Sequence, residues 1–205
     1  MRWYDFRQKM FALGCFSIHQ VYAWDPGFDR NNFVRWTRKG YLVRLRREWY
    51  AFAEHVGRPD MATYVAGRIY RPSYISLHSA LSFYGLIPES VVQITSVTSL
   101  KTATFKNAFG EYSYQSVRED LMFGYEPRAL AGGRSALFAT REKALLDLLY
   151  LYPFYMTEQA LGDLRLDRDV LHEDVDRAAW ESLTERFRCA ALARRARLLS
   201  KVYAL

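Results

Sequence analysis

Half of the 205 residues are hydrophobic, which excludes a disordered chain and suits one large domain or two small ones. No apolar run reaches the roughly 18 to 20 residues that span a bilayer, and the N-terminus lacks the apolar segment of a signal peptide, so we expect a cytoplasmic protein without a membrane partner. Residues 1–59 hold 11 Lys and Arg against 5 Asp and Glu, a net charge of +6, whereas residues 60–152 carry +1 and residues 153–205 carry zero. A polyanion-binding surface is therefore expected in the first 59 residues.

The chain begins with two predicted helices. Residues 2–13 predict an amphipathic helix that ends at Gly14, and its apolar face consists of Trp3, Phe6, Met10 and Leu13. Ser17 is placed to cap a second helix over residues 18–24, and Asp25-Pro26-Gly27 is typical of a turn.

Residues 29–52 (DRNNFVRWTRKGYLVRLRREWYAF) predict a third helix followed by a hairpin. Asp29 is a capping residue, Gly40 ends the helix, and the hairpin turns at Arg46-Arg47-Glu48. The spacing of Phe33, Trp36 and Gly40 directs one helical face toward a core.

A second face of this helix carries a row of polar and basic side chains, Asn31, Arg35 and Arg38. A helix with an apolar stripe inward and such a row outward fits the DNA major groove, where Arg pairs with guanine and Asn with adenine. The hairpin would be a wing, with its arginines near phosphates. The predicted DNA-binding residues are Arg30, Asn31, Asn32, Arg35, Arg38, Lys39, Arg44, Arg46 and Arg47.

Taken alone, this stretch fits equally well a solvated helix face beside an ordinary hairpin. The order of helix, helix, turn, helix and hairpin within about 52 residues, together with the local positive charge, favours a winged helix-turn-helix that binds double-stranded DNA. A winged helix that binds a protein partner without specific DNA binding is the alternative.

Residues 54–60 (EHVGRPD) are polar, contain Gly and Pro, and indicate a linker. We therefore predict two domains, a winged helix-turn-helix over residues 1–56 and an α+β domain over residues 57–205. The second domain is expected to have a small antiparallel sheet with helices on one side. Its predicted helices cover residues 60–70, 77–84 after a Ser76 cap, and 141–151 after a Thr140 cap. Its predicted strands cover residues 91–98, 102–105, 112–117, 121–125 and 135–139.

From Thr157 onward the pattern is helical. Residues 153–185 carry a net charge of −6 and residues 186–205 a net charge of +6. We favour an antiparallel helical hairpin in which the two halves pair by charge. The alternative, contact with nucleic acid or an acidic partner, uses the basic residues of the final helix, Arg186, Arg188, Arg194, Arg195, Arg197 and Lys201.

No pattern indicates catalysis, a metal or a cofactor. The four histidines are scattered, Cys15 and Cys189 have no metal-type spacing, and no glycine-rich phosphate loop or nucleophile motif is present. Glu142, Lys143 and Asp147 are interpreted as helix-end charges next to the Thr140 cap rather than as a polar network in a cleft.

Four segments, RPSYISLHSALSFYGLIPE (71–89), ITSVTS (94–99), FGEYSY (109–114) and TREKALLDLLYL (140–151), together with residues 31–52, closely resemble the AbiEi-type antitoxins. This family comprises predicted transcriptional regulators of type IV toxin-antitoxin and abortive-infection systems. The resemblance covers nearly the whole chain. It implies an N-terminal winged helix that represses its own operon at promoter repeats, and a C-terminal domain that opposes a nucleotidyltransferase-like toxin, with direct contact between the two left open.

Two positions depart from the family pattern. Glu48 stands where the wing usually turns at Gly, and because a positive φ there would be strained, we expect a different turn or a longer loop. His78 stands where the family often has Glu, and we interpret it as a surface substitution.

Overall fold

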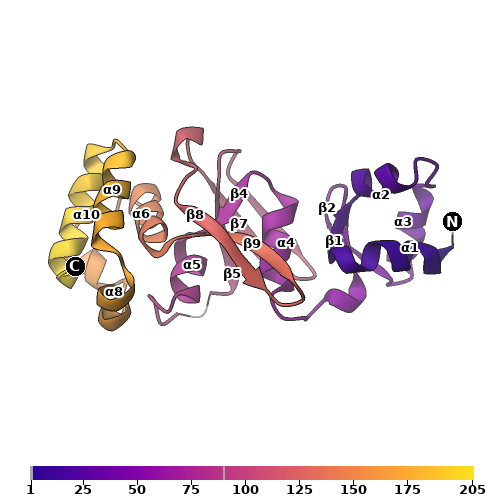
Figure 1. Cartoon of the computed structure of the whole chain (residues 1–205), viewed down its shortest axis with the longest axis horizontal. Coiled ribbons are helices and arrows are strands. Elements are labelled where there is room, and N and C mark those ends of the chain that lie inside the picture. Colours follow the sequence, from indigo (N-terminus) through magenta and orange to yellow (C-terminus); the bar gives the residue numbers. More distant parts are fainter. Residues whose placement is uncertain (1, 90) are drawn as a thin grey trace.

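The computed structural model describes residues 2–89 and 91–205 and has a mixed α+β architecture. The molecule is elongated, with its N-terminal helices at one end and its C-terminal helices at the other (Figure 1). No helix in the described ranges is both long enough and apolar enough to cross a membrane. We refer to residues 2–56 as the N-terminal part and to residues 57–205 as the C-terminal part.

The predicted helices of the N-terminal part are confirmed. Gly14 ends the first helical stretch with a φ of 72°. Ser17 forms a capping box with Gln20, and the Asp29 carboxylate accepts the backbone N–H of Asn31 at 2.9 Å. The elements in this part are α1 (Trp3–Met10), η1 (Phe11–Leu13), β1 (Cys15–Ser17), α2 (Ile18–Trp24), α3 (Asn31–Arg38), β2 (Leu42–Arg46), β3 (Trp49–Phe52) and η2 (Ala53–His55).

A three-stranded antiparallel sheet, in the order β1-β3-β2, forms the base of this part. The strand β1 was not predicted from the sequence. One face of the sheet packs against the three helices, through Phe16, Leu42 and Phe52. The opposite face, with Cys15, Leu45 and Ala51, is also buried, against the C-terminal part. Since both faces are covered, the three residues of β1 are all buried instead of alternating.

The turn of the β2–β3 hairpin differs from the expectation. Glu48 adopts a φ of 67°, so the chain keeps a short turn at Arg47 and Glu48 despite the missing glycine. The carbonyl of Glu48 accepts the backbone N–H of Ile18 at 2.9 Å, and its carboxylate lies 3.4 Å from His19. These contacts with the start of α2 hold the left-handed backbone in place.

The C-terminal part contains a six-stranded sheet in the order β6-β7-β5-β4-β9-β8. The expected antiparallel sheet is in fact mixed, because β4 pairs with β9 and β5 with β7 in parallel. The predicted strand over residues 121–125 is also wrong, since a 3₁₀ turn ends at Leu121 and the strand begins at Tyr125. The strands are β4 (Ser73–Ile75), β5 (Gln93–Thr98), β6 (Ala103–Asn107), β7 (Gly110–Ser116), β8 (Tyr125–Leu130) and β9 (Arg134–Ala139), with η3 (Glu119–Leu121) before β8.

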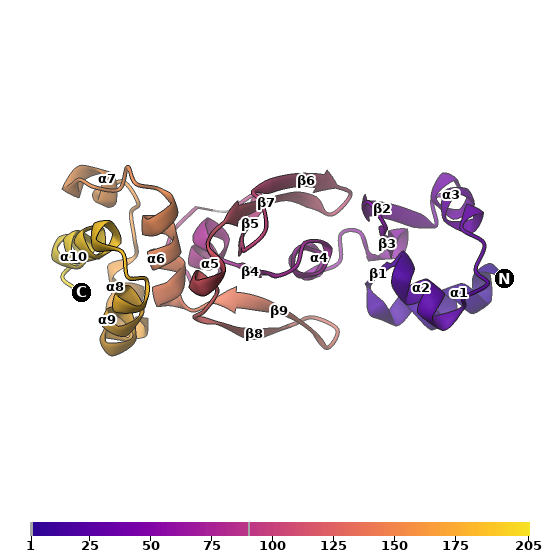
Figure 2. The same cartoon turned by 90° about the horizontal axis from the view of Figure 1, so that it is seen from above.

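Helix α4 (Met61–Ile69) lies between two hairpins, β6–β7 on one side and β8–β9 on the other (Figure 2). The Tyr114 hydroxyl of β7 donates to the carbonyl of Ala66 at 2.8 Å. On the other side, a methyl group at Gly67 would lie 3.8 Å from the Cβ of Ala136 in β9. Helices α5 (Leu77–Phe83) and α6 (Arg141–Leu151) pack at the far end of the sheet, so helices do not lie on one side only.

Glu142 and Lys143 lie in the first turn of α6, beside the Thr140 cap as expected, but they and Asp147 are buried in the core and are not exposed helix-end charges. Lys143 and Asp147 form an ion pair, and both side chains are inaccessible to solvent. The hydroxyls of Tyr74 and Ser76 donate to the Asp147 carboxylate at 2.9 and 2.8 Å. Burial raises the pKa of Asp147 and lowers the pKa of Lys143, so the pair depends on these contacts to remain ionised. Ser76 therefore binds Asp147 and does not cap α5 with its side chain.

The last helices are α7 (Glu158–Gly162), α8 (Arg168–Asp174), α9 (Arg177–Arg186) and α10 (Ala190–Tyr203). Helices α9 and α10 form the expected hairpin, side by side in Figure 1. The charge pairing predicted between the acidic and basic halves is nearly absent. Within the described ranges it is limited to Lys201 and Glu158, 2.7 Å apart. Apolar side chains hold the hairpin to α6 instead, among them Trp180, Leu192 and Leu199.

The N-terminal and C-terminal parts share a buried contact that we call the seam. It consists of Cys15, Leu45 and Ala51 from the three-stranded sheet and of Met61, Val65, Ala66, Ile69, Tyr70, Tyr112 and Tyr114 from α4, its following residue and β7. Hydrogen bonds cross the seam from Tyr64 to the carbonyl of Leu13 at 3.1 Å and from Asn107 to the carbonyl of Leu45 at 3.2 Å. Residues 56–60 of the predicted linker are exposed, but His55 is buried beside Phe11.

The seam predicts that the two parts unfold together. Four of the five tryptophans lie in the N-terminal part, so tryptophan fluorescence reports mainly on that part while far-ultraviolet circular dichroism reports on both. In urea, the two signals should give coincident transitions in the native protein. Leu45→Ala should lower the free energy of unfolding by about 2 to 5 kcal/mol, because it leaves a cavity in the seam. It should therefore move the fluorescence transition, and with it the circular dichroism transition, to lower urea concentration.

The exposed Leu137 offers a matched control, since Leu137→Ala removes the same atoms from the surface of β9. It should leave the transitions coincident and within about 0.5 kcal/mol of the native protein. Separate transitions in the native protein would show that the seam does not couple the parts.

Candidate nucleic-acid interface

Aromatic packing fixes the orientation of α3. The ring of Phe33 stacks on Tyr50 at a centroid distance of 4.7 Å. Trp36 lies 4.6 Å from Phe6 and 4.9 Å from Trp3, both in α1. Because these two α3 side chains are locked into the core one turn apart, the helix cannot rotate about its axis, and the opposite face must remain outside.

The exposed face carries the predicted row. Asn31, Arg35 and Arg38 are all exposed and recur at helical spacing. Val34 lies beside them and is 51% exposed. It was missed from the sequence, although its spacing of three residues from Asn31 could have placed it there. The row thus presents amide, guanidinium and methyl groups together, the groups that distinguish base edges in the major groove.

Asn32 is placed differently from the prediction. Its side chain is only 3% exposed and accepts a hydrogen bond from the Arg35 guanidinium. A buried amide cannot reach a base or a phosphate, so Asn32 is removed from the set of direct contacts. Its observable role is to hold the guanidinium of Arg35.

Arg46 is also misplaced by the prediction, because it points into the seam. Its guanidinium lies 4.7 Å from the ring of Tyr70 and 4.5 Å from the ring of Phe105, and it donates to the carbonyl of Ile69 at 2.8 Å. These contacts satisfy the charge by cation–π attraction and a hydrogen bond. Arg46 is therefore not available to a phosphate.

The remaining predicted residues, Arg30, Lys39, Arg44 and Arg47, are exposed around α3 and the hairpin. Together with Arg35 and Arg38 they form no ion pair with any carboxylate in residues 2–89 and 91–205. The structure thus leaves six cationic side chains of this region without an acidic partner. Of the nine predicted site residues, seven are exposed and two are not.

His78, the other departure from the family pattern, is half-buried rather than a surface residue. Its ring centroid lies 6.1 Å from that of Tyr152, and burial lowers its pKa. No group of three or more His, Cys, Asp or Glu residues in the described part of the chain is placed to hold a metal ion.

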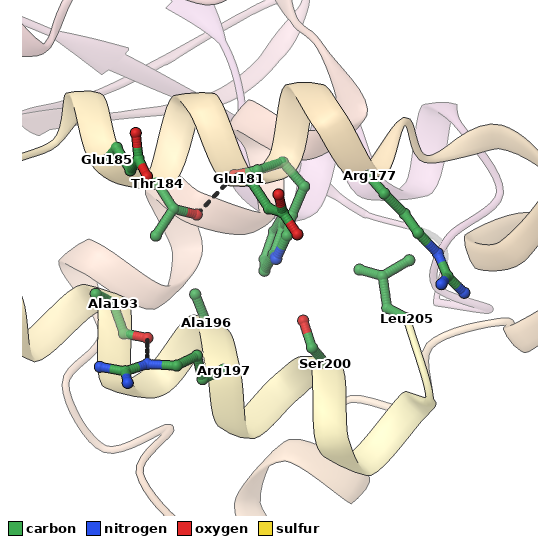
Figure 3. Close-up of a pocket in the computed structure, with 10 residues that line it drawn as sticks. Arg177, Glu181, Thr184, Glu185, Ala193, Ala196, Arg197, Ser200 and Leu205 are labelled. Carbon is green, nitrogen blue, oxygen red and sulfur yellow. Dashed lines mark hydrogen bonds between the residues drawn. The ribbon is translucent and has the colours of Figure 1, made fainter.

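A hollow of about 430 Å³ lies between α9 and α10 (Figure 3), at the opposite end of the molecule from α3 (Figure 1). Leu205 and Ala196 extend into it, and Thr184 and Arg197 direct their hydrogen bonds to carbonyls of their own helices, those of Trp180 and Ala193. These polar groups are already satisfied within the hairpin, which is typical of a gap between packed helices.

Comparison with protein-family models and with curated proteins found no match to this chain.

Arg46 lies in the seam and Arg47 is exposed, and this difference predicts different effects of their substitution on stability. Arg46→Ala should destabilise the protein by about 1 to 3 kcal/mol, because it removes a partly buried hydrogen bond and two cation–π contacts from the seam. Arg47→Ala, one residue away and exposed, should change the free energy of unfolding by less than about 0.5 kcal/mol. Urea denaturation of both variants measures the difference, and equal values would show that Arg46 does not stabilise the seam.

Proposed function

We propose that the N-terminal part is a winged helix-turn-helix that binds double-stranded DNA and represses the operon encoding the protein. The observation that carries the proposal is the row on α3. Asn31, Val34, Arg35 and Arg38 face outward on a helix whose opposite side is fixed by aromatic packing. Such a helix can enter the major groove without rearranging its own fold.

Phosphate contacts would come from the exposed cations around this row. Arg30 and Lys39 flank the two ends of α3, and Arg44 and Arg47 lie on the hairpin. Six cations, counting Arg35 and Arg38, have no acidic partner among the described residues, which favours a polyanion over a neutral protein surface, because each neutralised phosphate releases counterions. The alternative, a winged helix that binds a protein partner, gains some support from the burial of one hairpin face in the seam, which removes Arg46 from the phosphate-binding set.

The antitoxin role is supported by sequence resemblance and not by the geometry of α3. It is proposed from the resemblance of residues 71–89, 94–99, 109–114 and 140–151 to AbiEi-type antitoxins, and it assigns opposition to a nucleotidyltransferase-like toxin to the C-terminal part. We propose no catalytic activity and no cofactor for the protein. The resemblance leaves open whether the toxin is contacted directly.

Binding to DNA from the region upstream of its own gene should be strongly salt-dependent. With some four to six phosphates neutralised per monomer, the logarithm of the binding constant should fall with the logarithm of salt concentration at a slope of about −3 to −6. Fluorescence anisotropy with labelled DNA at several salt concentrations measures this slope. An absence of binding at low salt, or a salt-independent interaction, would favour the protein-interaction alternative.

Variants of the same protein separate base reading from phosphate contact. Arg35→Ala or Asn31→Ala should weaken the free energy of binding to the preferred DNA site by about 1 to 3 kcal/mol and reduce discrimination against other sequences. Arg47→Ala should weaken binding to all sequences alike and reduce the slope by about one unit. Discrimination that survives the loss of both Arg35 and Asn31 would mean that another surface reads the DNA.

The antitoxin role is tested in cells that express the toxin expected to be encoded alongside. The full-length double variant Arg35→Ala/Arg38→Ala should still restore growth while failing to repress a promoter reporter, because the two activities reside in different parts. The full chain is used because a fragment beginning at residue 60 would expose Met61, Val65 and Ile69 of the seam. A folded double variant that no longer rescues growth would place α3 in the antitoxin activity.

A further inference from the structure

Three arginines of the C-terminal part converge beside the seam. The guanidinium carbons of Arg68 and Arg134 lie 5.8 and 5.5 Å from the ring centroid of Tyr64. Arg68 also lies 5.8 Å from the ring of Trp49 in the N-terminal part. Arg71 follows α4, and burial together with repulsion from Arg68 lowers its pKa. Arg68 thus shares the ring of Tyr64 with Arg134 and lies close enough to Arg71 to lower its pKa.

In the part of the chain that the structure describes, carboxylates neutralise five arginines, but not these three or the exposed arginines around α3. Arg7, Arg118, Arg128, Arg141 and Arg165 each form an ion pair. Within the described ranges, none of Arg68, Arg71 and Arg134 does, and the Nε atoms of Arg68 and Arg134 are buried without a hydrogen-bond acceptor. The Asp60 carboxylate is directed to the backbone N–H of Ala131, at 2.9 Å.

Cys15 does not supply the missing negative charge. All three arginines act on its thiol, but burial raises the pKa of Cys15 to about 12, so the sulfur is neutral at physiological pH. Like charges gathered without a counter-charge repel one another, and arginine is the side chain best suited to bind a tetrahedral anion through paired N–H groups.

Space for a ligand adjoins the cluster at Arg71; Arg68 and Arg134 do not line it. A hollow of about 500 Å³ is lined by Arg71 and by Gly67, Ser73, Met122, Tyr125 and Ser135. Tyr125 is partly exposed and stacks on Tyr74 at a centroid distance of 4.7 Å, and Ser135 is exposed. A guanidinium, a hydroxyl and an aromatic ring around one hollow suit a small molecule with a charged end and a flat or apolar body.

We propose that Arg68, Arg71 and Arg134 bind a phosphate group of a small phosphorylated molecule whose remaining part occupies the hollow beside Arg71. The site differs from the α3 surface and does not depend on the proposed function. A phosphate of a nucleic-acid backbone has the same chemistry, and the experiment below distinguishes the two sources.

The test is calorimetric titration of the full-length protein with sodium pyrophosphate at constant ionic strength. The native protein should bind it, and Arg68→Gln and Arg134→Gln should each weaken binding at least about tenfold, the effect of one lost charge-assisted hydrogen bond. The control Arg118→Gln removes an exposed, ion-paired arginine and should leave the affinity unchanged. If Arg68→Gln fails to fold, Arg68→Lys retains the charge without the paired N–H groups and should still weaken binding.

A stability readout separates ligand binding from a structural role. Without pyrophosphate, Arg68→Gln and Arg134→Gln should have melting temperatures close to that of the native protein, because the repulsion that is relieved offsets the lost cation–π contacts. With pyrophosphate, the native protein should gain more stability than either variant. If the native protein does not bind pyrophosphate but the double variant Arg68→Gln/Arg134→Gln lowers the salt slope of DNA binding by about two units, the phosphate is that of the DNA backbone. Native-like pyrophosphate affinity in the variants, or neither pyrophosphate binding nor a change in the salt slope, overturns the proposal.

Discussion

The burial of the three-stranded sheet on both faces governs the arrangement of this molecule. One face holds the aromatic core under α1, α2 and α3, and the other forms the seam with α4 and β7. A hairpin in strict alternation would place Arg44 and Arg46 on the same face. The register shifts between these two residues, and the resulting bulge turns Arg46 to the side of Leu45, into the seam. Since β2 follows α3 after three residues, anchoring the hairpin also fixes the direction in which α3 faces relative to the C-terminal part.

Local signals in the sequence were sufficient for most helices and turns. Ser17, Thr140 and Gly14 act within one turn of their own position, so their effect does not depend on the rest of the fold. The outward row on α3 was also predictable, because Phe33 and Trp36 determine the inward face. The misplacement of Asn32 has a local cause, since it lies next to the buried Phe33 and accepts a hydrogen bond from Arg35 on the same helix. The misplacement of Arg46 has a non-local cause, since a bulge turns it toward the rings of residues 70 and 105.

The buried ion pair of α6 is a further feature that local sequence signals do not predict. Lys143 and Asp147, four residues apart near a capping threonine, fit an exposed helix-end pair by sequence alone. The structure instead surrounds the ammonium with the rings of Phe123 and Phe187, at 4.6 and 4.3 Å, and gives the carboxylate two hydroxyl donors. Desolvating both charges opposes burial, and only this combination of contacts offsets it. Because Tyr74 belongs to β4 and Phe187 follows α9, the pair fixes α6 against both the sheet and the last helices. Such a pair contributes to a defined packing more than to net stability.

The seam and α3 are connected through strands β3 and β2. This connection determines whether a ligand at the proposed phosphate site can change the affinity for DNA. Bound phosphate stabilises the folded protein by RT ln(1 + [L]/Kd), about 2.7 kcal/mol at a ligand concentration of 100 Kd. Stabilisation alone does not alter DNA affinity, because a ligand shifts an equilibrium only between states that it binds unequally. Trp49, beside Arg68, is in β3, and β3 is paired with the strand that follows α3. A phosphate ligand would change DNA affinity only through a second arrangement that it binds unequally, such as one in which Arg68 moves away from the ring of Trp49, 5.8 Å from it here. Any such coupling between the two proposed ligands would act in both directions with equal magnitude.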